Sequence, residues 1–228
     1  MRFLHNFGKF LISVGVGILL FVLWTLKGTD IYTHNQQRHL EAEFDALPRL
    51  TLAPEEDASV DDPDPKPPKP PVNFEDDLKA GDPVFRMAIP SIDVEDMVVE
   101  GVGVDDLRKG PGHYPSCRPE FEKPWCTDFE EVFPGEKGRV IVSGHRTTYG
   151  APFWGLDKVK NGDVINVETL WGRYEYTVFK KEVVEPDTPT VVVSIDDAAE
   201  LVITTCNPRF SASERLVVYA RLSEARPA

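Results

Sequence analysis

The hydrophobic pattern of the first 30 residues predicts a membrane-spanning helix. The uncharged run FLISVGVGILLFVLWTL fills residues 10–26, between a basic start with Arg2 and Lys9 and the closing Lys27. Its length is at the short end of the roughly 17 to 25 residues that a spanning helix needs. Basic residues ahead of the run favour a cytoplasmic N-terminus, residues 1–9, with the rest of the chain outside the cell. We therefore expect a single-pass anchor in the cell membrane.

A cleaved signal peptide has a similar layout of basic start and apolar stretch. Its cleavage site needs small residues, whereas the segment TLKGTDIY that ends the apolar run offers mainly large or charged ones. We therefore expect the anchor to stay attached to the mature protein.

The pattern becomes polar after the anchor. Residues 27–47 form a polar juxtamembrane segment that can extend the anchor as a short helix, and residues 48–82 are rich in proline and acid without apolar periodicity. Such a composition cannot pack a core, so we predict a disordered linker there. We expect residues 1–75 to contribute no catalytic group and to be dispensable for chemistry in solution.

From Pro83 onward, short runs rich in Val, Ile, Tyr and Thr are bounded by Gly, Pro, Asp and Asn, which is typical of β-strands. The runs are VFRMAIPSI, EDMVVEGV, GRVIVSGH, DVINVET, RYEYTVFKKEVVE, ELVITTC and ERLVVYARL. Two short helices are predicted between them, at 104–109 and 151–160. Frequent strands with few helices favour an all-β fold, either a closed barrel or a sandwich, over an α/β fold.

Charge and composition then exclude some functions. The formal net charge is −13, and ten acids against three lysines in residues 51–82 account for −7 of it. The acidic excess therefore belongs largely to the linker and says little about the folded domain. Because no basic face is visible, we expect no nucleic-acid partner.

Three side chains near strand ends suggest acyl transfer. Cys206 ends the run ELVITTC, His145 ends VIVSGH, and Arg215 lies in the strand that would pair with the cysteine strand. A thiolate attacks carbonyl groups, an imidazole moves the proton, and a guanidinium can hold a developing oxyanion. A core cysteine, a loop histidine and a solvated arginine remain the alternative. Close metal-ligand pairs such as Cys-x-x-Cys are absent from the sequence, so we expect no metal and no cofactor.

The segments SGHRTTYGAPF and TTCNPRFSASERLVVYARL resemble the two signature segments of the sortase family, and GPGHYP resembles a third segment of its class E members. The resemblance implies a closed eight-stranded sortase-type β-barrel over residues 83–223, with a short tail at 224–228. It also implies that Cys206 is the nucleophile, His145 the general acid/base and Arg215 the oxyanion or substrate stabiliser.

Further expectations concern substrate contacts. The resemblance implies that Thr205 lines the substrate groove and that the loop between RYEYTVFKKEVV and ELVITTC shapes substrate choice. We also place Tyr149 and His113 among the candidate substrate-binding residues, although His113 could equally be structural.

The sequence departs from the class E pattern in the insertion SCRPEFEKPWCTDFEEVFPGEKG, residues 116–138. Cys117 and Cys126 bracket its first half. In an exported protein, two cysteines that close so short a loop are most simply a disulfide, with two free thiols as the alternative. Cys206 would then be the one free thiol.

The family resemblance implies a membrane-anchored cysteine transpeptidase. It would cleave an LAXTG or LPXTG sorting signal near the end of a secreted protein, between Thr and Gly, and pass the acyl group to an amine of lipid II or peptidoglycan. A pilus-polymerising sortase, an exported cysteine peptidase and a non-catalytic anchored β module remain alternatives. The first is disfavoured because DDPDP lacks the aromatic residue of a lid plug.

Overall fold

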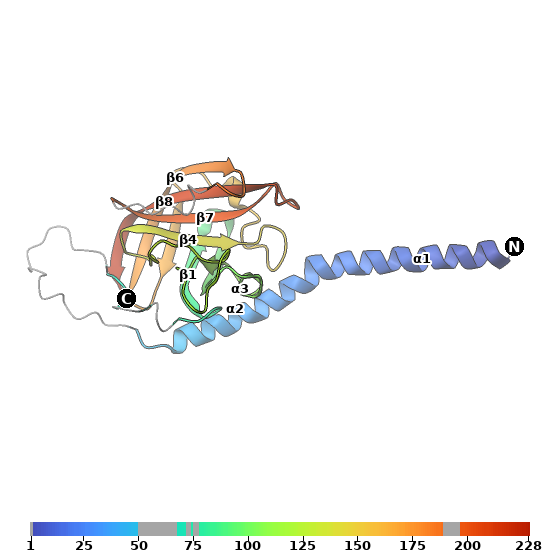
Figure 1. Cartoon of the computed structure of the whole chain (residues 1–228), viewed down its shortest axis with the longest axis horizontal. Coiled ribbons are helices and arrows are strands. Elements are labelled where there is room, and N and C mark those ends of the chain that lie inside the picture. The colour runs from blue at the N-terminus through green and yellow to red at the C-terminus, as the bar shows by residue number, and fades with distance from the viewer. Residues whose placement is uncertain (1, 50–67, 72–73, 75–77, 189–196) are drawn as a thin grey trace, which may run out of the picture.

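The computed structural model describes residues 2–49, 68–71, 74, 78–188 and 197–228. Most of the predicted linker, 48–82, lies outside these ranges, as does the centre of the loop that precedes ELVITTC. Figure 1 shows a barrel with one long helical segment running along it and projecting far beyond it.

The projecting segment contains the predicted anchor. Helix α1 spans Arg2–Leu23, a π-helical turn follows at Trp24–Gly28, and helix α2 spans Thr29–Ala46. Within the described residues, one stretch, His5–Leu23, is long and apolar enough to cross a membrane, and none of that stretch is buried against the protein. Apolar side chains that point outward all round a helix fit a lipid environment.

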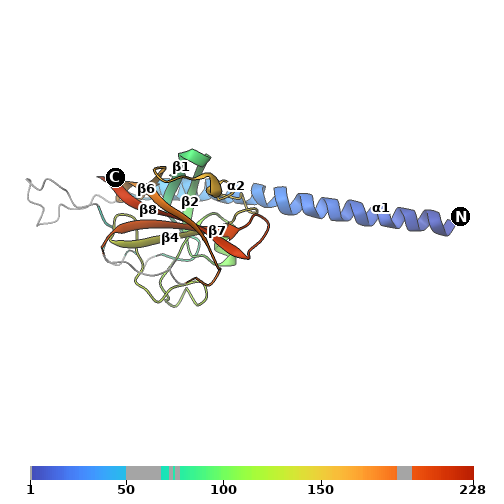
Figure 2. The same ribbon diagram turned by 90° about the horizontal axis from the view of Figure 1, so that it is seen from above.

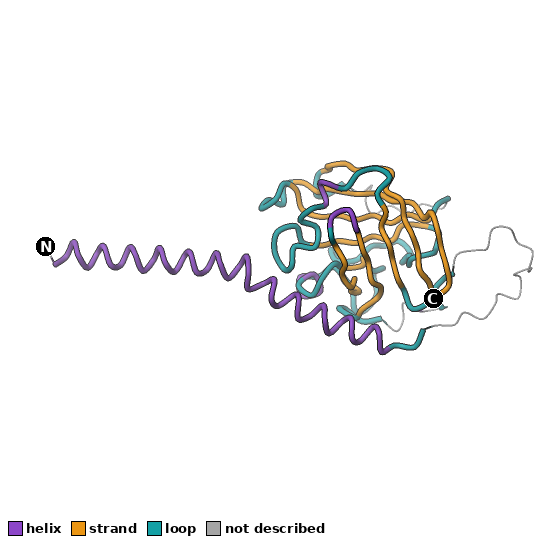
Figure 3. The backbone as a smooth tube through the Cα atoms, turned by 180° about the vertical axis from the view of Figure 1, so that it is seen from behind, coloured by secondary structure: helices purple, strands orange, loops and turns teal. Residues whose placement is uncertain are grey.

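Helix α2 confirms the expected helical extension but does more than extend the anchor. Four of its side chains are buried: Thr33, Gln37, Leu40 and Phe44. Their spacing of three or four residues places them on one helix face, and that face packs against β1 and β2 of the barrel. The view from behind in Figure 3 also shows the second half of the helix alongside the strands. The segment expected to be a polar juxtamembrane stretch therefore packs on the barrel, while the dispensability of residues 1–75 for chemistry stays a prediction.

The barrel has eight strands and is closed, as the family resemblance implied. Around the barrel the order is β1-β2-β3-β4-β7-β8-β6-β5, with parallel pairing in β2·β3 and β4·β7. The strands are β1 (Pro83–Ile89), β2 (Val94–Glu100), β3 (Gly112–His113), β4 (Gly138–Gly144), β5 (Val164–Glu168), β6 (Gly172–Val184), β7 (Ala199–Asn207) and β8 (Glu214–Pro227). Figure 2 shows β4, β7 and β8 side by side on one wall.

Apolar and polar residues alternate along these strands because every second side chain points into the barrel. Strand β1 has the burial pattern of a wall whose inward residues are large, and its Phe85 and Met87 are fully buried. Trp171 and Tyr176 fill the core, and their polar ends are satisfied, since Trp171 Nε1 donates to Pro134 O at 3.2 Å. Burial of large aromatic residues with paired polar atoms gives the barrel a rigid interior.

Three sequence predictions need correction. The helix expected at 104–109 exists as α3 (Val104–Leu107), but 151–160 forms only a 3₁₀ turn at Leu156–Lys158. Phe153, Leu156 and Val159 are buried there through a series of tight turns instead. The short strand β3 was hidden inside the GPGHYP motif, where glycine and proline suggest a loop.

The boundaries of the folded domain are also wider than predicted. Strand β8 continues to Pro227, paired with β6, so residues 224–228 are largely strand rather than tail. At the other end, the ring of Phe74 packs edge-on against Trp171 at 5.0 Å, and Tyr174 donates to Pro68 O at 2.8 Å. The described end of the linker therefore lies against the barrel.

Candidate active site

The pairing of β4 with β7 brings the predicted nucleophile and histidine together. The two strands run parallel, and their last paired residues are Gly144 and Thr205. His145 and Cys206 come next, so they lie side by side at the same end of neighbouring strands. Cys206 is a half-buried free thiol. Two residues 61 positions apart in sequence thus meet because parallel strands end at the same edge.

Thr205 has a different position from the one expected. Its side chain is buried, with 3% of the residue exposed, and its hydroxyl donates to Gly144 O at 2.7 Å. This bond ties the residue before the cysteine to the residue before the histidine. The structure therefore places Thr205 behind the site as a brace between the two strands.

Arg215 reaches the site through the antiparallel pairing of β7 with β8. Its Cα lies directly opposite that of Cys206, and side chains of directly opposed residues share one face of a sheet. The Nη1 group donates to Ala212 O and Glu214 O, both at 3.0 Å. Among the described residues, no group accepts a hydrogen bond from the Nε or Nη2 of Arg215. These donors of the planar guanidinium are therefore available to bind a substrate oxygen.

His145 lies in a partly dry environment. Its ring is tilted by 31° against that of Tyr149, with centroids 5.0 Å apart. Burial, and then the positive charge of Arg108, hold the pKa of His145 below its usual range. Both effects disfavour the charged imidazolium. At neutral pH the imidazole is therefore neutral and able to accept a proton.

Sequence reasoning missed a buried arginine beside the histidine. Arg146 is 5% exposed and donates to Cys206 O at 3.2 Å and to Asn207 Oδ1 at 3.1 Å. Its Nη2 pairs with Asp157 at 2.9 Å, and Arg209 pairs with the same carboxylate oxygen at 2.7 Å. These hydrogen bonds and ion pairs hold the segment that follows Cys206 against the segment that follows His145. The one available signal was a cation immediately after His145 in SGHR.

The structure favours the structural alternative for His113. The residue is 1% exposed, and both ring nitrogens are engaged, Nδ1 with Glu100 at 2.9 Å and Nε2 with Val132 O at 3.0 Å. Burial opposes its charged form, but the nearby carboxylates of Glu100 and Glu131 outweigh burial and raise the pKa of His113. Burial likewise raises the pKa of Glu100 to about 7. His113 is therefore part of a buried ionic cluster that supports the insertion.

The same cluster contains three side chains of the kinds that bind metal ions. Ligand atoms of Glu100, His113 and Glu131 lie within 4.8 Å of one another. However, Arg118 already pairs with both carboxylates. The Nε2–H of His113 donates to Val132 O, and a second proton on Nδ1 is donated to Glu100. The arginine and the protonated histidine balance the two acids, which leaves no charge for a metal ion to neutralise.

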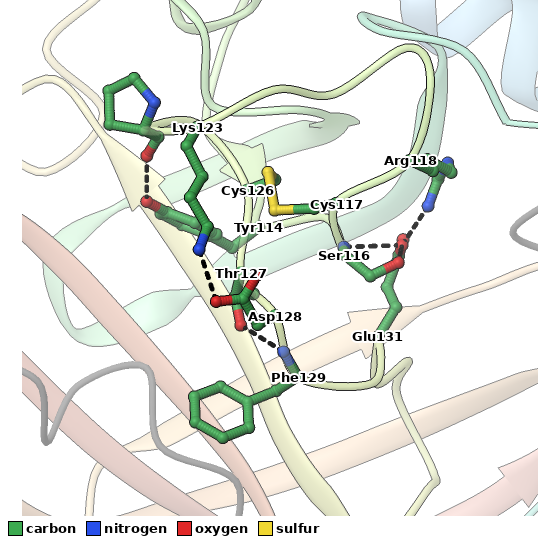
Figure 4. Close-up of a disulfide and its surroundings, with 11 residues drawn as sticks. Tyr114, Ser116, Cys117, Arg118, Lys123, Cys126, Thr127, Asp128, Phe129 and Glu131 are labelled. Atoms are coloured by element: carbon green, nitrogen blue, oxygen red, sulfur yellow. Dashed lines mark hydrogen bonds and ion pairs between the residues drawn. A yellow bond between two sulfur atoms is a disulfide. The ribbon is translucent and has the colours of Figure 1, made fainter.

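The disulfide between Cys117 and Cys126 is confirmed, with Cα atoms 4.9 Å apart. Figure 4 shows that the neighbouring Ser116 and Arg118 both reach Glu131, the Ser116 N–H at 3.1 Å. The inserted loop is thus held by the disulfide between Cys117 and Cys126 and by the contacts of Ser116 and Arg118 with Glu131.

The site as a whole combines a free thiol, a neutral imidazole and a guanidinium at one end of a closed barrel. These groups suit nucleophilic attack on an acyl carbon, proton transfer and stabilisation of a tetrahedral oxyanion. This geometry agrees with the chemistry that the sequence motifs suggested.

Comparison with known sequences supports the same family. A sortase domain model matches residues 87–223. Sortase D of Bacillus subtilis (strain 168) is 30% identical over 139 residues, which are 59% of this chain and 61% of the relative. Sortase SrtE1 of Streptomyces coelicolor is 27% identical over an alignment of 234 positions, which covers 96% of this chain and 57% of the relative. The chain therefore spans about three fifths of the length of these curated relatives.

Solved structures agree with this assignment. Sortase E from Streptomyces avermitilis matches with a TM-score of 0.53 at 29% identity, covering 65% of this chain and 93% of that one. A Clostridium perfringens sortase D5 transpeptidase matches with a TM-score of 0.55 at 28% identity, covering 66% of this chain and 84% of that one. The match to SrtE1 over nearly the whole chain supports the class E resemblance. From its barrel, its motifs and these matches, the chain belongs to the sortase family.

Proposed function

We propose that this protein is a membrane-anchored cysteine transpeptidase that attaches secreted proteins to the cell wall. The observation that carries the proposal is the placement of Cys206 beside His145 on the adjacent parallel strand and opposite Arg215 on the adjacent antiparallel strand. Relatives support a peptide substrate, since one solved structure is SrtE1 of Streptomyces coelicolor with a tripeptide in the active site.

In the proposed reaction, the neutral His145 imidazole takes the proton of the Cys206 thiol, and the resulting thiolate attacks the carbonyl carbon of the threonine in a Thr–Gly bond. A C–S bond forms, and the carbonyl electrons move to oxygen, where free donors of Arg215 stabilise the oxyanion. The C–N bond then breaks, and the departing glycine amine takes a proton from the His145 imidazolium. The products of this half are a thioester on Cys206 and a released C-terminal tail.

The second half repeats these steps in reverse order with a different amine. An amine of lipid II or peptidoglycan attacks the thioester, its proton passes to the neutral His145, and the cysteine leaves as the thiolate. A buried imidazole beside Arg108 is neutral at this stage, which suits it to accept that proton. No cofactor takes part in this scheme.

The sorting signal is proposed to be of the LAXTG or LPXTG type, with LAXTG preferred because of the class E resemblance. The anchor α1 would hold the enzyme in the membrane with the barrel outside the cell, on the face where secreted substrates are tethered. Tethering both partners to one surface raises their effective concentration.

Incubating the full chain in detergent with an LAXTG peptide and an amine acceptor tests the proposal. We expect Cys206-dependent release of the tail and formation of the peptide–acceptor adduct, and Cys206→Ala should abolish both while leaving the fold intact. Cleavage with water alone as acceptor at all amine concentrations would indicate a peptidase. Retention of more than about a tenth of the activity in Cys206→Ala would exclude the cysteine as nucleophile, because loss of a nucleophile costs several orders of magnitude.

A further inference from the structure

The membrane-proximal end of α2 contacts the loop that follows the histidine. The N–H of Tyr149 donates to Thr29 Oγ1 at 3.2 Å, and the N–H of Gly150 donates to Asp30 Oδ1 at 3.1 Å. The helix also passes close to this loop, since a Cβ added at Gly150 would lie 3.2 Å from Thr33 Cγ2. Residues 120 positions apart in sequence are thus joined at the catalytic end of the barrel.

The contacted loop has an unfavourable backbone. Tyr149, Gly150 and Ala151 have φ values of 51°, 76° and 46°, all in the left-handed region. Non-glycine residues in this region are strained, because their Cβ lies too close to the backbone. Such a conformation persists only when its surroundings hold it. The two acceptors on α2 bind N–H groups in the middle of this turn.

The same loop carries the neighbour of the catalytic imidazole. The ring of Tyr149 lies against that of His145 at 5.0 Å, and the guanidinium carbon of Arg108 lies 5.7 Å from the Tyr149 ring centroid. The carbonyl of Arg108 accepts a hydrogen bond from Thr33 Oγ1 at 2.8 Å. Helix α2 therefore contacts both residues that set the surroundings of His145.

The helix is itself fixed firmly to the barrel. The buried amide of Gln37 accepts from Met97 N–H at 2.7 Å and donates to Met97 O at 3.1 Å and Lys109 O at 2.9 Å. Gly110 makes room for it, since a Cβ there would lie 2.1 Å from Gln37 Nε2. The first glycine of the GPGHYP motif thus permits docking of the helix. A buried side chain with all these bonds satisfied gives a specific and rigid contact.

We propose that Thr29 and Asp30 are positioning residues for His145, acting through the Tyr149–Gly150 turn. The inference rests on the proposed catalytic role of His145. Thr29 follows the end of the apolar run by three residues, or about 5 Å of helix. The anchor therefore shapes the catalytic end of the barrel and holds it next to the membrane surface, in addition to tethering the enzyme.

The test uses the full chain in detergent micelles, with Thr29→Val, Asp30→Ala and the double variant. Asp30→Asn keeps an acceptor oxygen and should restore most of the function. Glu43→Ala is the matched control because Glu43 is an exposed acid on the same helix. For each protein, kcat and KM for peptide cleavage, the melting temperature, and the NMR titration of the His145 ring are measured.

We expect the double variant to lose about three- to tenfold in kcat with little change in KM, which corresponds to one or two hydrogen bonds of ordinary strength. Its His145 ring should titrate at higher pH than in the wild type, because a loosened Tyr149 ring admits water and burial is the main cause of the lowered pKa. A purely structural role would lower the melting temperature and leave this titration unchanged.

A double variant that keeps the wild-type kcat and His145 titration would overturn the proposal, as would equal losses in Glu43→Ala. The titration needs no substrate, so it reports on the coupling even if the wild type proves not to cleave sorting signals. Failure of the proposed function would instead appear as absence of Cys206-dependent cleavage in the wild type.

Discussion

At the residue scale, substitution of Arg215 tests whether the site stabilises an oxyanion through directed hydrogen-bond donors or through positive charge alone. Arg215→Lys keeps the charge but loses the planar set of donors, and the two residues are not interchangeable at such a site. Loss of one oxyanion donor lowers the chemical step by about 10²–10³-fold. We expect at least a tenfold loss of kcat/KM in Arg215→Lys and Arg215→Ala, with alkylation of Cys206 by iodoacetamide little changed. Normal turnover in the lysine variant, at unchanged stability, would refute the donor role.

Arg108 provides a second test at this scale, because its charge contributes to the lowered pKa of His145. A nearby positive charge disfavours the imidazolium, so its removal in Arg108→Gln should raise the pKa of His145. NMR titration of the ring measures the change directly. Arg226→Gln removes an exposed arginine elsewhere on the barrel and serves as the control. The same His145 pKa in both variants would show that burial alone lowers it.

At the scale of elements, the buried cluster of Glu100, His113, Glu131 and Arg118 joins β2, β3 and the insertion. His113→Gln leaves two buried carboxylates with one arginine, and breaking a buried ion pair typically costs about 3–5 kcal/mol. The raised pKa of His113 means that the folded cluster keeps the imidazolium proton at a pH where the unfolded chain has released it, so this contribution to stability is fully present below about pH 6.5 and is lost as pH rises above that value. We expect the variant to melt at lower temperature, and its deficit to be largest at low pH. Calorimetry from pH 4.5 to 8 measures this, and a constant deficit would contradict the assignment.

At the scale of the whole molecule, α2 belongs to the folded domain. A chain that begins at residue 29 keeps this helix, whereas one that begins at residue 73 loses it and exposes the surface that Leu40 and Phe44 cover. Burial of each such side chain is worth about 1.5–3 kcal/mol. For a domain of this size that loss lowers the melting temperature by on the order of 10 °C. We expect the longer chain to melt like the full protein once detergent is matched, and the shorter one to melt earlier and cleave peptide more slowly. Equal melting temperatures would show that the helix is only a tether.

Much of the protein could be predicted from its sequence because the deciding signals are local. Alternation of apolar and polar residues marked seven of the eight strands, and the continuous apolar run marked the helix that fits a membrane anchor. Motifs around His145 and Cys206 identified the family, and the short spacing of Cys117 and Cys126 identified the disulfide. Each of these signals lies within one element or one short loop.

The remaining features depend on contacts between distant segments, which no local pattern reports. Gln37 looks like any polar helix residue until the barrel presents Met97 and Lys109 to it. Arg146 looks like a surface cation until the strand ends bring Cys206 and Asp157 around it. The role of His113 stayed open because its acidic partners Glu100 and Glu131 come from outside its own motif. The amino-acid pattern was enough to predict seven strands, the long apolar N-terminal helix and the residue types of the site, because alternation, apolar length and motif chemistry are local features. Which polar side chains are buried became clear from the folded structure alone, since burial and hydrogen-bond partners arise when separate elements pack together.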